Sequence, residues 1–170
     1  MNKILSIILL SFFIFNFAHA SKKTTYLKCP MMMKENRGET FPESWWPIGS
    51  QLNEFFVKIV EGKKDKITIN KYFTGKNFRE DSKPKHWDYL KNLVPERNGN
   101  ILKYSVSDSY KMDGKDHKES ETFIFTKDST WKSEYLEFAD LPSVPMNLKH
   151  KLVGDCSELD KKTYKKLIKG

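Results

Sequence analysis

The feature that most constrains the fold of this 170-residue chain is a repeated apolar–polar alternation with a period of two. In residues 52–61, Phe55 and Ile59 share one side. A polar turn at residues 62–65 follows, and residues 66–73 resume the alternation. Successive side chains of a β-strand point to opposite faces, so this pattern predicts two half-buried strands joined in a β-hairpin.

The same period recurs through much of the remaining chain. It predicts further strands at residues 26–29, 101–110, 119–127, 130–138 and 146–156. Turn residues separate some of them, as at Asp113–Gly114. Within the strand at 130–138 the apolar side changes from Tyr135 to Leu136, which predicts a bulge or a strand end near Tyr135.

Short strands in hairpin succession predict an all-β, mainly antiparallel domain. A sheet of this size removes its open edges by closing into a barrel or by stacking on a second sheet. We therefore expect a single β-barrel or a half-open β-sandwich of about 7–8 strands, and a barrel of about eight strands has room for side chains or one small ligand.

Two segments break the period of two. In residues 82–94, Trp87, Leu90 and Val94 recur at helical spacing behind a serine cap, which predicts one short internal helix. The final segment, residues 157–170, carries apolar residues at helical spacing among five lysines. This pattern predicts a C-terminal helix packed on the sheet, and a frayed basic tail is the alternative.

The first twenty residues have the pattern of a cleaved secretory signal peptide. Lys3 precedes an apolar stretch at residues 4–17, and Ala18 and Ala20 supply the small residues of a cleavage site. A membrane anchor is the alternative, but the stretch has about 14 residues and a spanning helix needs about 20. No cysteine directly follows the cleavage site, so we expect no lipidation. We predict a single exported domain at residues 21–170, periplasmic or extracellular, with no membrane-spanning segment after cleavage.

Cys29 and Cys156 are the two cysteines of the chain, and both lie in the exported part. An even count in an oxidising compartment predicts a disulfide, which would place the first strand beside the last. A redox or nucleophilic pair is the alternative, but the spacing is not C-x-x-C and no histidine is adjacent in sequence. For a closed loop of about 128 residues, the chain-entropy model gives an upper limit of about 4.7 kcal/mol.

Composition excludes several classes of protein. Aromatic residues make up 14% of the chain, which argues against disorder, and 31% charged residues are too many for a polytopic membrane protein. The net charge is +8, but the basic residues are 27 lysines and only 3 arginines. Nucleic-acid recognition relies on the planar guanidinium group, so we expect no nucleic-acid partner. A lysine-rich surface instead suits an anionic envelope surface.

No catalytic or metal-binding pattern stands out. The histidines after the signal are His86, His117 and His150, and none has the H-x-x-x-H or H-x-H spacing of metal ligands. His117 is in a charged turn and should be solvated, whereas His150 alternates with Leu148 and Leu152 and should point inward. The chain also lacks a G-x-S-x-G motif and a glycine-rich phosphate loop, so we expect no cofactor and name no catalytic residue.

Residues 40–49 form the most unusual segment, with Trp45 and Trp46 between two prolines. In a barrel such a stretch would form a lid or a ligand wall, because aromatic side chains line most small-molecule sites. The alternative, which we prefer, is a loop that plugs the barrel and completes its core.

Aromatic richness without catalytic spacing leads to our main functional hypothesis, a non-enzymatic exported β-domain that binds a small apolar ligand or an envelope component. Its ligand wall would consist of Trp45, Trp46, Phe55, Phe123, Phe125 and Tyr135. The second hypothesis is a small envelope enzyme with His150 as a base beside Asp155 or Glu158. The third is a structural or inhibitory domain that presents a lysine-rich face to anionic partners.

The length, the signal and a cysteine near each end of the mature chain make the layout similar to that of lipocalin-like exported barrels. The early G-x-W pattern of lipocalins is absent, because tryptophan precedes glycine in Trp45–Trp46–Pro47–Ile48–Gly49. The resemblance therefore implies a barrel layout, and it implies no particular ligand.

Overall fold

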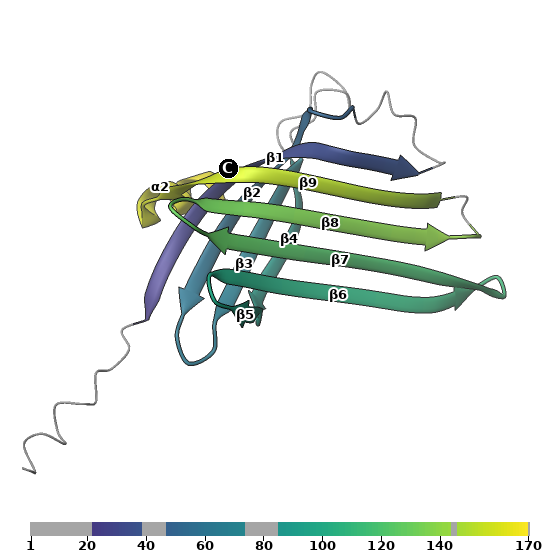
Figure 1. The fold of residues 1–170 in the computed structure, drawn as a ribbon, viewed down its shortest axis with the longest axis horizontal. Coiled ribbons are helices and arrows are strands. Elements are labelled where there is room, and N and C mark those ends of the chain that lie inside the picture. Colours follow the sequence, from purple (N-terminus) through teal and green to yellow (C-terminus); the bar gives the residue numbers. More distant parts are fainter. Residues whose placement is uncertain (1–21, 39–46, 74–84, 144–145, 170) are drawn as a thin grey trace, which may run out of the picture.

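The computed structural model describes residues 22–38, 47–73, 85–143 and 146–169. Within them, nine strands form one antiparallel sheet, and one short helix follows (Figure 1). The elements are β1 (Lys23–Gly38), β2 (Gln51–Glu61), β3 (Lys66–Phe73), β4 (Lys85–Leu93), β5 (Glu96–Asn98), β6 (Ile101–Met112), β7 (Lys115–Lys127), β8 (Trp131–Leu141), β9 (Met146–Leu159) and α2 (Lys161–Leu167). The predicted signal peptide, residues 1–20, lies outside the described residues.

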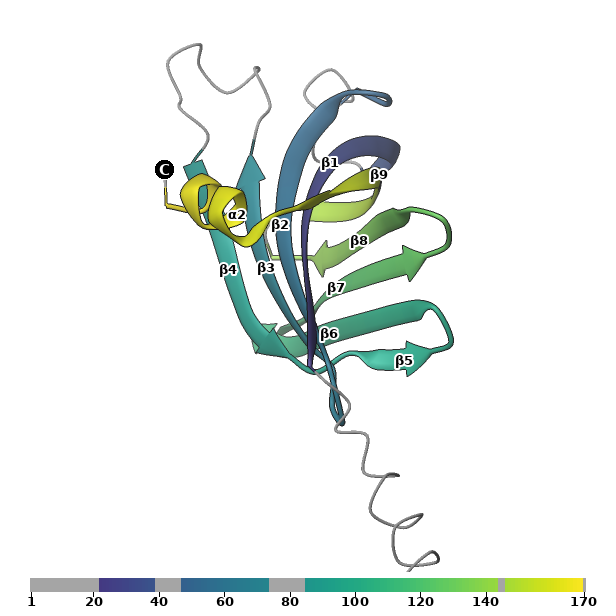
Figure 2. The same ribbon diagram turned by 90° about the vertical axis from the view of Figure 1, so that its left-hand side faces the viewer.

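The strand order in the sheet is β4-β3-β2-β1-β9-β8-β7-β6-β5. The first and last strands are therefore neighbours in the middle of the sheet, and its edges are β4 and β5, which follow each other in sequence. Figure 2 shows that the sheet curls, so that the half made by β1–β4 turns across the half made by β6–β9. This half-barrel confirms the predicted all-β antiparallel class, although it has nine strands instead of 7–8.

The apolar sides of the strands face the inside of the curl and form one core. The predicted hairpin is present, and Val57 of β2 lies opposite Ile69 of β3. Because a shift of one residue would turn every apolar side chain to the other face, burial of this side fixes the register. The buried core residues are Leu27, Cys29, Met31, Met33, Phe55, Val57, Ile59, Ile67, Ile69, Leu102, Phe123, Phe125, Trp131, Tyr135, Leu152 and Cys156.

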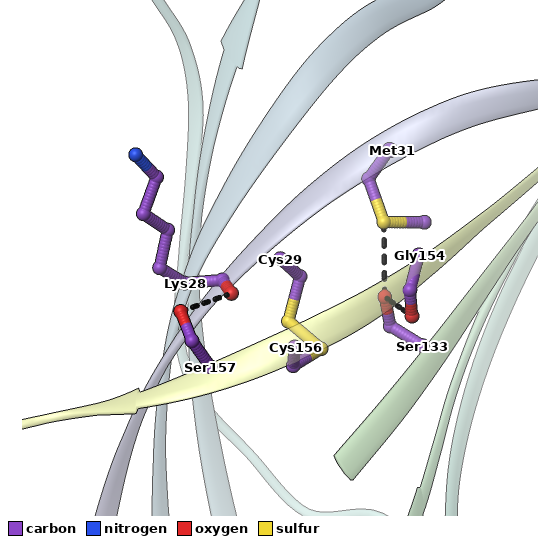
Figure 3. The surroundings of a disulfide bond; sticks show 7 residues. All are labelled: Lys28, Cys29, Met31, Ser133, Gly154, Cys156 and Ser157. Carbon is purple, nitrogen blue, oxygen red and sulfur yellow. Dashed lines mark hydrogen bonds between the residues drawn. A yellow bond between two sulfur atoms is a disulfide. The ribbon is translucent and has the colours of Figure 1, made fainter. Parts of the chain in front are cut away.

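Cys29 of β1 and Cys156 of β9 form the predicted disulfide, with an S–S distance of 2.04 Å (Figure 3). The bond joins two neighbouring strands at residues 127 positions apart in sequence. Gly154 lies nearby, and a Cβ atom there would come within 2.3 Å of the carbonyl oxygen of Pro30. The missing side chain of Gly154 therefore allows β1 and β9 to approach closely beside the disulfide.

The predicted internal helix at residues 82–94 is wrong, because β4 occupies most of this range. A register shift against β3 lets three residues of β4 span two residues of β3. In this bulge Asn92 has a positive φ of 56°, and Leu90 and Leu93 both pack against the core. A spacing of three residues, which is typical of a helix, here belongs to a bulged strand.

The predicted C-terminal helix is present as α2. The carboxylate of Asp160 caps it by accepting hydrogen bonds from the backbone N–H groups of Lys162 and Thr163, at 2.8 and 3.0 Å. Tyr164 is the buried residue of the helix and packs on Phe56 of β2. Since Phe56 alternates with the core residues of β2, α2 covers the outer face of the sheet.

Candidate binding groove

The aromatic residues predicted to form a ligand wall fall into two groups. Trp45 and Trp46 lie outside the described residues. The other four, Phe55, Phe123, Phe125 and Tyr135, are buried in the core. Ring centroids are 5.0 Å apart for Phe123 and Tyr135 and 5.6 Å apart for Phe55 and Tyr135. These rings pack on one another, and their role as a ligand wall stays a prediction.

The inner face of β7, β8 and β9 changes from apolar to polar between two successive rows of inward-facing residues. One row across the three strands consists of Phe123, Tyr135 and Leu152. The next inner row consists of Glu121, Glu137 and His150. Opposite residues of antiparallel strands point to the same face, so these three polar side chains lie side by side.

Lys71 of β3 reaches this polar row from the opposite half of the curl. Its Nζ lies 2.8 Å from Oε1 of Glu121, and the hydroxyl of Tyr135 donates a hydrogen bond to the same oxygen at 2.5 Å. Burial raises the pKa of Tyr135 far above its usual range, and the nearby charges of Glu137 and Glu121 raise it further. Tyr135 therefore keeps its proton and holds Glu121 in place.

His150 points inward as predicted, and Glu137 is the carboxylate beside it. Its Nδ1 lies 3.7 Å from Oε2 of Glu137, and 2% of the His150 side chain is exposed. Asp155 and Glu158 are five and eight residues further along β9, which corresponds to about 16 and 26 Å in an extended strand. The structure thus brings His150 to Glu137 and leaves Asp155 and Glu158 distant along the strand.

The polar row opens onto a groove of about 320 Å³ on the inner face of β6–β9. Its aliphatic residues are Val106, Ala139, Leu141 and Leu148. Its carboxylates are Asp108, Glu119, Glu121 and Glu137, and Ser107, Ser120 and Phe138 complete the lining. The volume lies within the range of small-molecule sites, but a lining with four carboxylates is more polar than that of most such sites.

The groove is negatively charged although the whole chain carries a net charge of +8. Asp108 accepts a hydrogen bond from the backbone N–H of Ser109 at 2.8 Å, and Glu119 accepts one from the hydroxyl of Tyr110 at 3.0 Å. The bond to Glu119 raises the pKa of Tyr110, so this partner is neutral. Among the described residues, Lys71 is the one lysine or arginine that forms an ion pair with any of the four groove carboxylates.

A second hollow, of about 640 Å³, lies beside the turn between β2 and β3. Its central charge is Arg97 of β5, whose Nη2 lies 2.9 Å from Oε1 of Glu61 and whose Nε donates to Asp65. The hydrogen bond to Asp65 is the main cause that raises the pKa of Arg97. These charges already satisfy one another and tie β5 to the β2–β3 hairpin, so we assign this hollow a structural role.

The prediction that His117 is solvated is wrong. β7 begins at Lys115, earlier than the sequence pattern indicates, so His117 falls within the strand and is fully buried. Its ring stacks on that of Tyr110 with centroids 5.2 Å apart, and its Nε2 lies 3.0 Å from Oγ of Ser143. His117 therefore supports Tyr110, the partner of a groove carboxylate.

The predicted bulge near Tyr135 is also wrong, because residues 131–140 pair with β7 and β9 without a register shift. Leu136 and Phe138 alternate with Glu137, which takes the inner position. The change of apolar phase therefore marks the place where the inner face becomes acidic. It is the sequence signal from which Glu137, one of the four groove carboxylates, could have been found.

Among the described residues, no cluster of three or more histidine, cysteine, aspartate or glutamate side chains is arranged to hold a metal ion. Within the same part of the chain, none of the helical segments has the length and apolarity needed to cross a lipid bilayer.

Comparison with protein-family models gave no match for this chain, and neither curated proteins nor solved structures gave a significant match. The function is therefore inferred from the groove itself.

Proposed function

We propose that this protein is an exported, non-enzymatic binding domain whose groove takes a small ligand with an apolar body and a positively charged group. The observation that carries the proposal is the placement of four carboxylates around aliphatic side chains in one groove. The apolar body would cover Val106 and Leu148, and the cation would lie near Asp108 and Glu119. The proposal keeps the apolar ligand of the sequence-based hypothesis and adds a requirement for positive charge.

The position of His150 favours binding over catalysis. A general base must come within about 3.2 Å of the group whose proton it takes, and only 2% of the His150 side chain is exposed. Tyr135 is likewise buried, and its raised pKa keeps it protonated. A small molecule in the groove would meet carboxylates and aliphatic carbons before either group.

A matched series of ligands tests the charge requirement. n-Octylammonium, n-octanol and n-octanoate share one apolar chain and differ in the charge of the head group. In titration calorimetry we expect n-octylammonium to bind most tightly, n-octanol to bind more weakly and n-octanoate not to bind. Added salt should weaken the binding of n-octylammonium, because exposed charges are screened. Equal affinity for the three head groups would contradict the proposal.

Two carboxylates of the groove can be neutralised without touching the ion pair of Lys71. The double variant Asp108→Asn, Glu119→Gln should bind n-octylammonium about 2- to 30-fold more weakly, because each of the two exposed charge interactions that it removes contributes about 0.2–1 kcal/mol. The matched control is Glu96→Gln with Asp155→Asn, which changes net charge equally at exposed positions outside the groove. If the control variant lost as much affinity for n-octylammonium, the binding would depend on the net charge of the protein and not on the groove carboxylates.

A second candidate function follows from the C-terminal helix. Tyr164 is buried against the sheet, and the lysines around it are exposed, namely Lys161, Lys162, Lys165, Lys166 and Lys169. Such a face suits an anionic envelope surface. Co-sedimentation with phosphatidylglycerol vesicles should exceed that with phosphatidylcholine vesicles, and Lys165→Gln with Lys166→Gln should reduce it. The same binding to both lipids would rule this function out.

A further inference from the structure

The groove is bordered by an open edge of the sheet. β6 pairs with β7 along its whole length, whereas β5 covers only Ile101–Lys103 of β6. In the part of the chain that the structure describes, residues 104–112 of β6 therefore have a neighbouring strand on one side only, as Figure 1 shows. Three groove residues, Val106, Ser107 and Asp108, come from this stretch.

The alternation of backbone groups identifies which residues of β6 face the open side. The carbonyl of Asn100, just before β6, accepts a hydrogen bond from the N–H of Lys127, at the end of β7. Alternate residues of an antiparallel strand turn their N–H and C=O groups to the same neighbour. The residues that turn these groups to the open side are therefore Ser105, Ser107, Ser109 and Lys111. The carboxylate of Asp108 accepts the N–H of Ser109, which gives that open-side donor a local partner.

This edge lacks the bulges and the short length that protect the other edges of the sheet, and its inward charge is that of Asp108. β4 carries two register shifts, and β5 has three residues and follows Pro95. β6 instead pairs with β7 without a register shift and contains no proline. A long, regular edge without bulges or proline is a template for another strand.

We infer that residues 104–112 of β6 bind an extended segment of a partner polypeptide as an added antiparallel strand, an inference that rests on the proposed function of the groove. The inner side chains of the added strand would lie opposite Val106, Asp108 and Tyr110. Val106 and Tyr110 are 43% and 39% exposed, which favours apolar side chains opposite them. The carboxylates of Asp108 and Glu119 favour a basic side chain on the added strand, between the two apolar side chains. The partner therefore alternates apolar and basic residues on one face of its strand.

Charge argues against a second copy of this chain as the occupant. Two copies paired antiparallel through β6 would bring their Asp108 carboxylates and their acidic grooves together. Like charges on neighbouring strands destabilise pairing, and complementary charge selects the partner. The acidic groove beside the edge thus favours a basic segment of another protein.

Backbone methylation of a peptide tests strand addition directly. The probe is acetyl-Thr-Val-Thr-Lys-Thr-Val-Thr-amide, in which valine and lysine form the inner face. The threonines are the residues opposite Ser105, Ser107 and Ser109, and their N–H groups would donate to the carbonyl groups of these serines. At Ser109 only the carbonyl group is open, because its N–H is bonded to Asp108. N-methylation of the threonines should therefore weaken binding by about tenfold or more. N-methylation of the valines and lysine, whose N–H groups would face solvent, should change affinity little.

Variants of the protein provide matched controls. Ser107→Pro removes an open-side N–H while leaving the ladder to β7 in place, so the fold should persist and peptide binding should be lost. Ser107→Ala keeps the N–H, so its effect on peptide affinity should be small beside that of Ser107→Pro. Asp108→Lys should reverse the charge preference for the central residue of the peptide, so that a peptide with glutamate in place of lysine binds more tightly.

The outcomes separate strand addition from the groove proposal. If both methylated peptides bind equally while n-octylammonium still binds, strand addition is wrong and the groove proposal stands. If neither the peptide nor n-octylammonium binds, both are wrong. Self-association that Ser107→Pro abolishes, measured by analytical ultracentrifugation, would overturn the inference in favour of a second copy.

Discussion

Lys71 of β3 and Glu121 of β7 form an ion pair across the inside of the curled sheet, with Nζ 2.8 Å from Oε1. The Lys71 side chain is 7% exposed, and its ammonium group lies 5.6 Å from the ring centroid of Phe123 and 5.4 Å from that of Tyr135. β3 and β7 belong to opposite halves of the strand order. This contact therefore links the two halves and positions one carboxylate of the groove.

Removal of the Lys71 charge should destabilise the fold. Lys71→Met leaves Glu121 partly buried without its ammonium partner, and we expect the free energy of unfolding to fall by about 1–3 kcal/mol in urea denaturation. A double-mutant cycle with Glu121→Gln should give a coupling energy of about 0.5–3 kcal/mol.

The pair Lys28–Glu54 provides the control for this cycle. Its charged atoms are a similar distance apart, 3.1 Å, but its lysine is 40% exposed; its glutamate is 17% exposed. Lys28→Met with Glu54→Gln should give a coupling of about 1 kcal/mol or less. A coupling for Lys71 and Glu121 no larger than that of the control would show that the pair does not hold the two halves together.

The raised pKa of Tyr135 makes a signed prediction about pH. The folded protein keeps the phenol proton, because burial and then Glu137 and Glu121 oppose its ionisation. The unfolded chain loses that proton above a pH of about 10, so the contribution of Tyr135 to stability is present below this pH and is lost as pH rises. The stability difference between the parent and Tyr135→Phe should therefore shrink by about 1.4 kcal/mol between pH 8 and pH 11. A difference that stays constant over this range would contradict the assignment.

Gly154 should not tolerate a side chain. The Cβ of Gly154→Ala would lie 2.3 Å from the carbonyl oxygen of Pro30, so a strand must shift, and we expect a loss of about 1–3 kcal/mol. Gly62→Ala is the control, because its Cβ would meet only Cγ of Lys22, at 3.8 Å. That variant should stay within about 0.5 kcal/mol of the parent in thermal or urea denaturation. Equal effects of the two substitutions would disprove close packing at Gly154.

Loss of the disulfide should lower stability more than any of these substitutions. Cys29→Ser with Cys156→Ser opens a link between residues 127 positions apart, and the expected cost is about 2–5 kcal/mol. The reduced parent should show the same loss, since the bond and not the cysteine side chains is responsible. Intact-mass measurement before and after reduction gives the matching check, and two free thiols in the unreduced protein would overturn the pairing.

The strands were predictable where the inner face is apolar. The alternation around Phe55 and Ile59 gives β2 within one residue of its start, and β3 matches its predicted bounds. Burial of one face enforces the period of two there. The disulfide was predictable because the chain has two cysteines, both in the part that the sequence predicts to be exported.

The pattern failed where backbone irregularity or charge changes the inner face. In β4 a bulge brings Leu90 and Leu93 to the core at a spacing of three, which imitates a helix. In β8 the inward Glu137 made Leu136 resemble the start of a new apolar side. The groove was missed because its carboxylates come from three strands, and only the register of those strands brings them together.

The most direct test of the groove as the binding site is a methyl NMR titration of the protein with n-octylammonium. We expect the methyl signals of Val106 and Leu148 to shift first, while those of Leu102 and Ile67 in the packed core remain in place. With Asp108→Asn and Glu119→Gln, the same shifts should require higher ligand concentrations. Shifts that appear first in the core methyls, or no shift at Val106 and Leu148 despite binding, would contradict the account.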